Sequence, residues 1–519
     1  MPRNPRHDVL FEPVKIGPLI ARNLFFQVPH CNGMGYAKPR SHAAMRGIKA
    51  EGGWAVVSTE EVEIHPSSDL SPYIEGRLWD DSDIPCLEMM SRAMHEHGAL
   101  AAIELREGFQ EDFVRFVKTV TSKPVVGVGR FTSPDTMAAQ IRRGILDFIG
   151  AARPSIADPF LPQKIADGDI DDIRECIGCN VCVTGDHTMT PIRCTQNPTM
   201  GEEWRKGWHP ERIRARESEK PVLIIGGGPA GLEAAHALGK RGYEVALAEA
   251  GTELGGRVTR EAKLPGLAAW ARVRDYRLLQ LHKLPNVQTY LASRLCTAEV
   301  LEFGYPRIVI ATGAKWRRDG VGHQHTSPLP IAPGAVVVTP DDIMDGAYPA
   351  GTRVVVWDDD HYYMGGVMAE ALAAKGYQVT YATPASEAST WTRNTMEQHF
   401  IQKRLLEAGV EIIVSHTLTA IAPDHAVLDC VFTGRQKILE VDAVLPVTAR
   451  LPEETLLHEL RAADLAAAGI ESVTAIGDAL APATIAHAIY AGRRYAEELD
   501  ATLLPPDTLP FRREITELL

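Results

Sequence analysis

The stretch Val222-Leu-Ile-Ile-Gly226-Gly-Gly228-Pro-Ala-Gly231 places a short apolar strand directly before a glycine turn and the start of a helix. Gly226 permits the tight turn, Gly228 lets a pyrophosphate approach the backbone, and Gly231 lets the helix pack closely against the strand. The phosphates would lie at the N-terminus of that helix, where unpaired N–H groups attract anions. The stretch therefore predicts a Rossmann-like domain that binds a dinucleotide.

Further motifs strengthen this nucleotide site. An acidic residue ends the next strand, where it would accept hydrogen bonds from an adenosine ribose, and a Gly-Gly-Arg turn follows it. Two later motifs, Ile310-Ala-Thr-Gly313 and Ile476-Gly-Asp478, are typical of the two-dinucleotide flavoprotein fold. Together they predict FAD or ADP as the ligand, because both share the pyrophosphate and ribose contacts. The predicted binding residues are Gly226, Gly228, Gly231, Glu249, Arg257, Thr312, Gly313 and Asp478.

A second β/α segment begins at Arg353, but its turn has a different composition. After the strand the chain reads Trp357-Asp-Asp-Asp-His-Tyr-Tyr-Met-Gly-Gly366, where an NAD(P)H domain would place glycines. Three carboxylates at the phosphate position would repel a pyrophosphate. We therefore expect a Rossmann-like domain that is kept for its packing and lacks the glycine motif for NAD(P)H.

Four of the eight cysteines fall in a C-x2-C-x2-C pattern with one more cysteine after it. Thiolates at this spacing can each bind one iron of a cube, with the fourth ligand returning from a loop. A structural zinc site would more usually show two separated C-x2-C pairs or a Cys/His set. The pattern favours one [4Fe–4S] cluster over zinc or free thiols. The predicted ligands are Cys176, Cys179, Cys182 and Cys194.

Before about residue 160, short apolar strands alternate with helical patterns, which is typical of a parallel sheet covered by helices. Strands are expected over 24–28, 54–58, 100–105, 125–129 and 148–152. Helices are expected over 41–50, 84–97, 109–121 and 136–143. The run is barrel-like but short.

Composition limits the function classes. The 519 residues exceed what one core usually holds, so several domains are expected. The net charge of −13 argues against a nucleic-acid or anionic-membrane partner, since those surfaces demand a basic face. The N-terminus shows no signal-peptide pattern and the chain no apolar run long enough to span a membrane. We expect a cytoplasmic protein, and leave open whether it is a homodimer.

These motifs resemble those of the old-yellow-enzyme-related amine dehydrogenases, typified by trimethylamine and dimethylamine dehydrogenases and by the demethylases of dimethylglycine and N-methylproline. The C-x2-C-x2-C spacing and the lack of NAD(P)H glycines favour this group over the dienoyl-CoA reductases. Beside the cysteines, the resemblance rests on Gln27-Val-Pro-His-Cys31, Lys49-Ala-Glu-Gly-Gly53, Val126-Gly-Val-Gly-Arg130, Ala152-Arg-Pro-Ser-Ile-Ala-Asp-Pro-Phe-Leu-Pro-Gln163 and Gly207-Trp-His-Pro210.

The resemblance implies an FMN at the C-terminal mouth of a (β/α)8 barrel. Cys31 matches the cysteine that bonds covalently to the flavin in trimethylamine dehydrogenase. Arg130 and Arg153 match flavin-binding positions, where basic groups would hold the phosphate. The candidate catalytic residues at strand ends are His30, Glu60 and Glu104.

The chain also departs from this family. The aromatic box that holds a methylated cation is replaced by Glu61 and Asp186, which disfavours trimethylamine itself. Only five strands can be counted where a closed barrel has eight, and about three β/α units are missing near 105–109. We hypothesise an internal deletion joined near Arg106 and Glu107.

The expected fold class is therefore α/β: a truncated TIM-type barrel, an iron–sulfur segment and two nested Rossmann-like domains. The expected boundaries are 1–160 for the partial FMN barrel, 161–218 for the cluster segment, 219–346 with 447–519 for the FAD- or ADP-binding domain, and 347–446 for the inserted domain.

The function expected from the resemblance is oxidative N-demethylation of a small methylated amine or amino acid. Electrons would pass from FMN to the cluster and then to a soluble acceptor such as an electron-transfer flavoprotein. Two alternatives stay open at this point: an NAD(P)H-dependent ene reductase of the dienoyl-CoA type, and an inactive nucleotide-binding or electron-transfer remnant.

Overall fold

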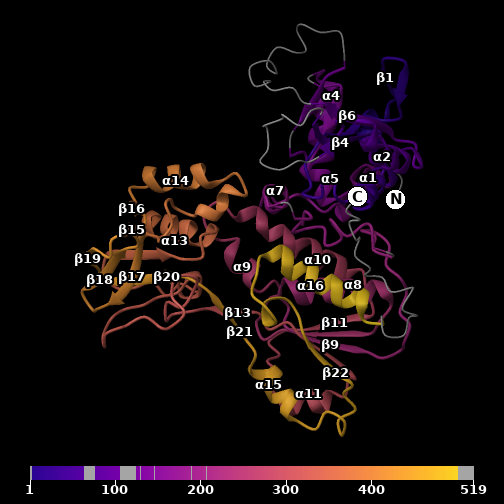
Figure 1. Ribbon diagram of the computed structural model, residues 1–519. Helices are drawn as coiled ribbons and strands as arrows, with labels where there is room; N and C mark the ends of the chain where they lie inside the picture. The colour runs from indigo at the N-terminus through magenta and orange to yellow at the C-terminus, as the bar shows by residue number, and fades with distance from the viewer. Residues whose placement is uncertain are drawn as a thin grey trace.

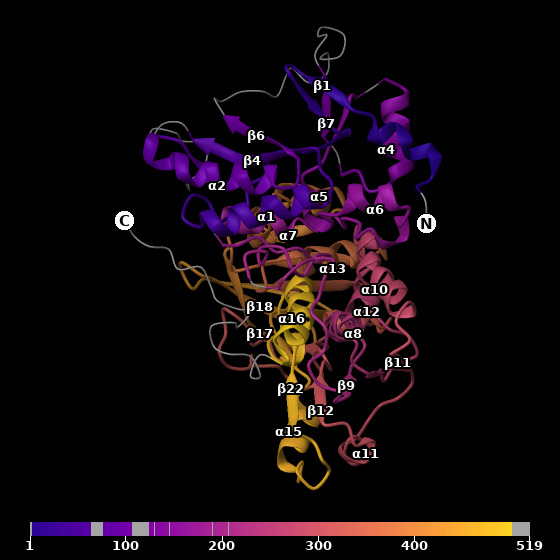
Figure 2. The same cartoon turned by 90° about the vertical axis from the view of Figure 1, so that its right-hand side faces the viewer.

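Three parallel β-sheets organise the computed structural model, which describes residues 3–63, 76–105, 124–128, 130–144, 146–188, 190–205 and 207–500. The N-terminal sheet and its helices lie at one end of the molecule (Figures 1 and 2). The nucleotide-binding sheet lies below it, and the third sheet, drawn in orange, lies to one side (Figure 1). No helix among these described ranges is long and apolar enough to cross a membrane.

The N-terminal sheet is an arc of parallel strands in the order β6–β4–β3–β8–β7, with β5 paired to the end of β4. The first strand of this sheet along the chain, β3, therefore lies beside the last, β8, as it does where a (β/α)8 barrel closes. The strand bounds are β3 (Phe25–Gln27), β4 (Val56–Glu63), β5 (Gly76–Arg77), β6 (Leu100–Leu105), β7 (Val126–Val128) and β8 (Phe148–Gly150). A small antiparallel hairpin, β1 (Val14–Ile16) with β2 (Leu19–Ala21), precedes them.

The strands expected from the sequence in this region are all present, with slightly different ends. The expected helices appear as α1 (Pro39–Glu51), α2 (Ile84–His95) and α4 (Pro134–Arg142), while the one expected over 109–121 lies outside the described residues. The core between sheet and helices contains the fully buried Trp54, whose indole N–H donates to the Pro159 carbonyl at 2.9 Å. This bond ties the sheet to the segment that follows it.

The nucleotide-binding domain has the five-stranded parallel order β11–β10–β9–β12–β22. Its helices α8 and α16 pack closely against each other: a Cβ at Gly492 of α16 would lie only 2.3 Å from the carbonyl oxygen of Ala230 in α8. The bounds are β9 (Val222–Ile225), α8 (Pro229–Arg241), β10 (Val245–Ala248), α9 (Arg257–Glu261), α10 (Arg272–His282), β11 (Val287–Tyr290), α11 (Thr297–Phe303), β12 (Arg307–Ile310), α15 (Thr455–Ala462), β22 (Ser472–Ala475) and α16 (Ile485–Glu498).

The inserted domain combines a parallel sheet, β16–β15–β14–β20, with an antiparallel sheet, β17–β18–β19. Apolar residues of β17 and β18 pack against Val355 and Trp357 of β14, so the two sheets share a core. Two strands that flank this domain in sequence, β13 (Ala314–Trp316) and β21 (Arg450–Pro452), pair with each other. The remaining bounds are α12 (Pro340–Met344), β14 (Arg353–Asp358), α13 (Tyr363–Ala374), β15 (Gln378–Ala382), α14 (Gln398–Glu407), β16 (Glu411–Ile413), β17 (His416–Ile421), β18 (His425–Cys430), β19 (Gln436–Glu440) and β20 (Ala443–Val447).

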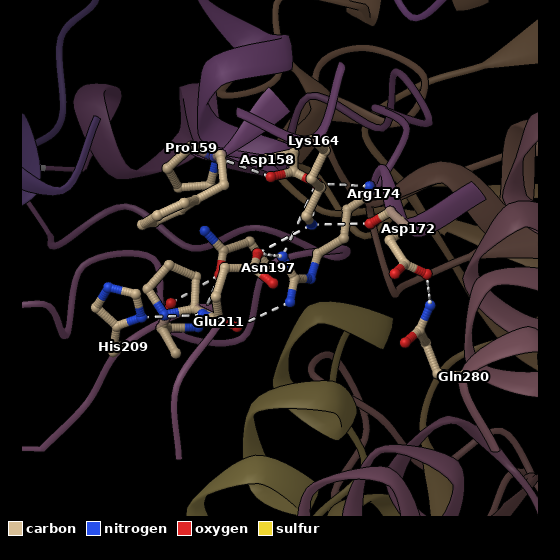
Figure 3. A network of polar contacts seen from close by, with 12 residues as sticks. Asp158, Pro159, Lys164, Asp172, Arg174, Asn197, His209, Glu211 and Gln280 are labelled. Atoms are coloured by element: carbon tan, nitrogen blue, oxygen red, sulfur yellow. Dashed lines mark hydrogen bonds and ion pairs between the residues drawn. The ribbon is translucent and has the colours of Figure 1, made fainter. Parts of the chain in front are cut away.

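The described part of the segment between the barrel-like sheet and the nucleotide domain has short helices: α5 (Arg153–Ala157), α6 (Leu161–Asp167), a 3-10 turn at Ile170–Asp172 and α7 (Val181–His187). A buried polar network holds it together (Figure 3). Lys164 Nζ donates to Asp158 Oδ2 at 2.7 Å and lies 2.9 Å from Glu211 Oε1, and Arg174 donates to the same Glu211 oxygen at 2.5 Å. Alternating charges therefore stabilise a stretch that has little regular structure.

Candidate functional site

The structure brings the four cysteines of the motif together around the start of α7. Burial raises the pKa of the Cys182 thiol well above its usual value, and the thiols of Cys194, Cys179 and Cys176 raise it further. Burial likewise raises the pKa of Cys194 to about 12, with Cys179 and Cys176 adding to the effect. Each thiol therefore lies within electrostatic range of the others, as a shared ligand set requires.

Hydrogen-bond donors surround two of these sulfurs. The Thr195 hydroxyl lies 3.1 Å from Cys179 Sγ, and the Gln196 N–H donates to Cys194 Sγ at 3.4 Å. Hydrogen bonds to thiolate sulfurs tune iron–sulfur clusters. Gly178 has a φ of +74°, which favours glycine, and a Cβ there would lie 2.0 Å from a guanidinium nitrogen of Arg130.

The cysteine arrangement fits a cluster better than a single ion. A zinc ion needs all its ligands within about 2.3 Å of one point. Among the described residues, no three His, Cys, Asp or Glu side chains are grouped closely enough to hold one ion. A [4Fe–4S] cube instead binds each thiolate to a different iron, so its ligands stand further apart. The donor set thus matches the predicted cofactor.

His30 and Cys31, which follow β3, lie near a pair of buried cations from α1. Arg46 and Lys49 are both fully buried. Arg46 donates to the His30 carbonyl at 2.8 Å and lies 3.1 Å from its Nε2, which Lys49 Nζ also contacts. Burial lowers the pKa of His30 well below its usual value, and the two cations lower it further. The imidazole is therefore neutral.

Arg46 is the centre of this polar group. Its pKa falls to about 10 because of burial, while Glu60 and Cys31 act in the opposite direction. Its Nε lies 3.3 Å from His42 Nε2, and the His42 Nδ1 lies 3.3 Å from the fully buried Glu60 carboxylate. Arg46 therefore interacts electrostatically with both Cys31 and Glu60. The predicted residues His30, Cys31 and Glu60 are thus brought together.

The other predicted flavin-side residues are placed as follows. Glu104 lies in β6 with its Cα opposite that of Glu61 in β4, and its side chain is outside what the structure describes. Arg153 begins α5 after β8 and donates to Asn180 Oδ1 at 2.6 Å. Arg130, after β7, lies against Gly178. Both arginines therefore face the cysteine loop from the strand ends of the sheet.

The nucleotide motif opens into a cavity of about 1090 Å³. Gly226 has a φ of +111°, and a Cβ at Gly231 would lie 1.9 Å from the Gly226 carbonyl, so both positions need glycine. A Cβ at Gly228 would meet nothing nearer than 4.0 Å, which leaves its backbone open to a phosphate. The predicted residues that line the cavity are Gly226, Gly228, Glu249, Arg257, Thr312, Gly313 and Asp478.

Polar groups in the cavity are already oriented. The Glu249 carboxylate accepts from the N–H groups of Gly227 at 2.8 Å and Gly251 at 2.6 Å. Arg257 donates to Asp478 Oδ2 at 2.8 Å, and Arg450 donates to the same oxygen at 2.6 Å. Glu249 therefore lies directly after β10, where a ribose would lie. Arg257 also donates to the Tyr363 hydroxyl at 3.1 Å, which connects it to α13 of the inserted domain.

The turn after β14 is filled by protein. Asp358 is fully buried and accepts from the Tyr381 hydroxyl and from the His361 N–H at 3.1 Å. A Cβ at Gly365 would lie 2.5 Å from the Asp358 carboxyl carbon. Burial raises the pKa of Asp358 to about 8, with neighbouring Asp360 adding to the shift. Carboxyl groups thus stand before α13, where a pyrophosphate would need open backbone.

Comparison with known proteins gives a relative over nearly the whole chain. Dimethylamine dehydrogenase of Hyphomicrobium sp. (strain x) is 32% identical, with 99% of this chain and 97% of the relative covered. The chain belongs to the old-yellow-enzyme-related amine dehydrogenase family. Among solved structures, histamine dehydrogenase from Rhizobium sp. 4-9 is 46% identical with a TM-score of 0.94, and 100% of both chains is covered.

A further structure supports the same family. The 6-hydroxypseudooxynicotine amine oxidase of Pseudomonas geniculata N1 is 37% identical with a TM-score of 0.90, and 95% of this chain and 99% of that chain are covered. Sequence profiles match the NADH:flavin oxidoreductase / NADH oxidase family over 9–111 and 106–172, the OYE-like second alpha/beta domain over 338–443, and the NAD(P)-binding Rossmann-like domain over 224–293.

These matches confirm the predicted amine dehydrogenase family, an FMN-dependent oxidoreductase, and a mixed α/β fold with a barrel-type and a Rossmann-like domain. The predicted cofactors, FMN, a [4Fe–4S] cluster and FAD or ADP, agree with this amine dehydrogenase family. The roles of individual residues and the domain boundaries stay predictions.

Sequence reasoning missed several site residues. Arg46 and Lys49 lie one helical turn apart on α1, and they were overlooked because lysine and arginine on a helix usually face water. The motif Lys49-Ala-Glu-Gly-Gly53 contained one clue: Lys49 follows Arg46 by three residues, which puts both side chains on the same face of a helix. Arg450 gave no local signal, because its partner Asp478 is distant in sequence.

Proposed function

We propose that the chain is a flavin and iron–sulfur amine dehydrogenase that oxidises a small methylated amine and passes the electrons to a soluble acceptor. The single observation that carries this is the cluster-like convergence of four thiols beside the buried His30, Arg46 and Glu60 group. Dimethylamine dehydrogenase and histamine dehydrogenase, by their names, act on amines. An amine substrate class is therefore supported from two relatives.

FMN, when bound, would accept two electrons and a proton equivalent from a C–H next to the amine nitrogen. Burial and the neighbouring Lys49 and Arg46 hold His30 neutral, so it would act beside the substrate amine as a neutral hydrogen-bonding imidazole. The buried Glu60 carboxylate supplies negative charge that attracts a substrate cation. The imine product hydrolyses to an aldehyde and the demethylated amine. Arg130 and Arg153 are the cations available for the flavin phosphate.

The cluster segment is the second part of the proposal. Cys176, Cys179, Cys182 and Cys194, which are all partly buried, would hold the [4Fe–4S] cluster. The nucleotide cavity would hold FAD or ADP on the backbone of Gly226 and Gly228. These assignments place the cluster between the flavin side and the nucleotide domain, near α7 (Figure 2).

We also infer an internal deletion in the barrel. The two edge strands of the described arc, β6 and β7, flank residues 106–123 in sequence, so additional β/α units would fit between them. The dimethylamine dehydrogenase alignment runs over 718 positions, whereas this chain has 519 residues. The family profile likewise matches in two pieces, 9–111 and 106–172, which meet at 106–111. An intact mass corresponding to a chain about 200 residues longer would contradict the deletion (a closed barrel has eight units).

The proposed activity can be tested on the purified protein. Anaerobic addition of dimethylamine, dimethylglycine or histamine is expected to bleach the flavin absorbance, while NADPH is expected to leave it unchanged. Yellow colour that stays with the acid-precipitated pellet, and moves to the supernatant in Cys31→Ala, would establish the covalent bond. Iron and nucleotide without any flavin would overturn the amine dehydrogenase proposal and favour an electron-transfer remnant.

A further inference from the structure

Lys49 lies between the flavin-side residues and the cysteine loop. Its side chain is fully buried on α1, and its Nζ contacts His30 Nε2. On the other side, the thiols of Cys182 and Cys194 lie within electrostatic range of the ammonium group. Met45 of the same helix packs in one apolar cluster with Cys182 and Cys194. Lys49 is therefore a buried cation of α1 that lies between the predicted flavin site and the predicted cluster site.

The described neighbours leave this cation short of negative charge. Burial lowers the pKa of Lys49 well below its usual value and Arg46 lowers it further, while Glu203 opposes the shift. The other nearby carboxylate, Glu60, acts on Arg46. A buried ammonium is stable only beside a compensating anion. A [4Fe–4S] cluster bound by four thiolates carries net negative charge in both oxidation states and would supply that anion.

Other charges near the cluster are less effective. Arg153 influences the Cys182 thiol, but it is partly exposed and donates to Asn180, so water screens its charge. Glu397 lies near Cys179 and is also only partly buried. Lys49 is fully buried, where a charge acts through a lower dielectric. Water therefore screens the charge of Lys49 less than it screens the charge of Arg153.

We propose that Lys49 is a positioning residue whose charge sets the electron affinity of the cluster, and that its place between His30 and Cys182 favours electron transfer toward the cluster. The proposal rests on the proposed function, namely that the four cysteines hold a [4Fe–4S] cluster. The step is the gain of one electron by the oxidised cluster, in which no bond forms and no proton moves. A nearby positive charge stabilises the reduced form because that form is more negative.

The test is a redox titration of the purified holoenzyme with dithionite, followed by electron paramagnetic resonance of the reduced cluster. Lys49→Met removes the charge at similar side-chain length, and we expect about a tenfold loss of electron affinity, which is about 59 mV for a one-electron couple. Lys49→Arg keeps the charge and is expected to stay near the wild-type potential. Lys240→Met, which removes a lysine that contacts the Glu211 carbonyl, is the control for loss of any one charge.

A second variant predicts a shift of opposite sign. Glu203 faces Lys49, and its own carboxyl is buried with one oxygen accepting from the Gly201 N–H at 2.8 Å. Glu203→Gln is nearly isosteric and removes a negative charge, provided that the titration is done well above the pKa of about 7 to which burial raises this carboxyl. The cluster potential is then expected to rise.

The possible outcomes distinguish failure of the Lys49 proposal from failure of the cluster assignment on which it rests. Equal shifts in Lys49→Met and Lys49→Arg, or an unchanged potential in Lys49→Met, would overturn the role of the charge. If Lys49→Met fails to retain its cluster, the rise expected in Glu203→Gln decides, and no rise overturns the proposal. Wild-type protein without iron would instead refute the cluster assignment itself.

Discussion

The nucleotide-binding domain and the N-terminal sheet build their sites in different ways. In the nucleotide domain, one continuous turn supplies the glycines, and a cavity of about 1090 Å³ opens directly above it. In the N-terminal sheet, the flavin-side group is assembled from side chains of β4, α1 and the residues after β3, and further strand ends would be needed to complete it. A site made by local backbone can therefore persist where a site made by many strand ends loses part of its walls.

This contrast predicts that the sites fail independently. Removing the cluster should leave the nucleotide cavity intact, because the two share no described ligand residue. Removing the nucleotide should likewise leave the cysteines in place. The predictions below test that independence, beginning with the largest effect.

Cys182→Ser is expected to abolish cluster binding. A serine hydroxyl is a much weaker iron ligand than a thiolate. Iron content should fall to a small fraction of the wild-type value, with loss of the brown colour, while bound FAD or ADP stays at the wild-type level. Cys430→Ser, far from the motif in sequence, is the matched control and should keep its iron. Unchanged iron in Cys182→Ser would contradict the ligand assignment.

Gly231→Val is expected to abolish nucleotide binding and to lower the free energy of unfolding by about 1–3 kcal/mol, as overpacking usually does. The new Cβ would lie 1.9 Å from the Gly226 carbonyl oxygen and force α8 away from β9. Nucleotide released by heating, measured by chromatography, gives the readout. Gly228→Ala is the contrasting variant: its Cβ has room, so binding should weaken while the thermal midpoint stays the same. Full nucleotide content in Gly231→Val would refute the assigned site.

What could be predicted from the sequence follows the same division. The strands near 24–28 and 100–105 and the turn at Gly226 were predictable because their signals are local in sequence. The antiparallel β17–β18–β19 sheet was not predicted, since its short strands carry mixed polar and apolar residues whose pairing depends on β14. The apolar pattern also gave no account of the buried ion pairs that Lys164 and Arg174 form with Asp158 and Glu211.

In the candidate site, too, residues with a local sequence pattern were predicted and residues defined by tertiary contacts were not. The cysteines and the glycine turn were found from spacing alone, and the structure brings each set together. Lys49 and Glu203 were missed because their importance depends on burial, which a sequence pattern does not report for charged residues. The placement of Arg46 between His30 and Glu60 is a tertiary contact of the same kind.

Lys164→Met is expected to cost about 3 kcal/mol of unfolding free energy, since it leaves the buried Asp158 carboxylate without its shortest ion pair. Denaturant unfolding measures the loss. Lys283→Met breaks an exposed pair with Asp172 and should cost less than about 1 kcal/mol. Because the network holds the cluster segment, the iron of Lys164→Met should also be lost at lower denaturant than the nucleotide. Similar costs for the two variants would contradict the role of burial.

The last expected effect is on acid stability, and it appears only at low pH. Burial alone would raise the pKa of Glu211, but Arg174 and Lys164 lower it well below its usual range. A carboxyl with a lowered folded pKa contributes stability above its unfolded pKa of about 4.5, and this contribution is lost as the pH falls toward the folded value. Glu211→Gln should therefore flatten the decline of stability below that pH, at about 1.4 kcal/mol for each unit of pKa shift removed. Unfolding midpoints measured across the acid range decide this, with the exposed Glu219→Gln as control. An equally steep acid decline in both variants would place the acid-sensitive contact outside the cluster segment and weaken the contrast between the two halves of the molecule.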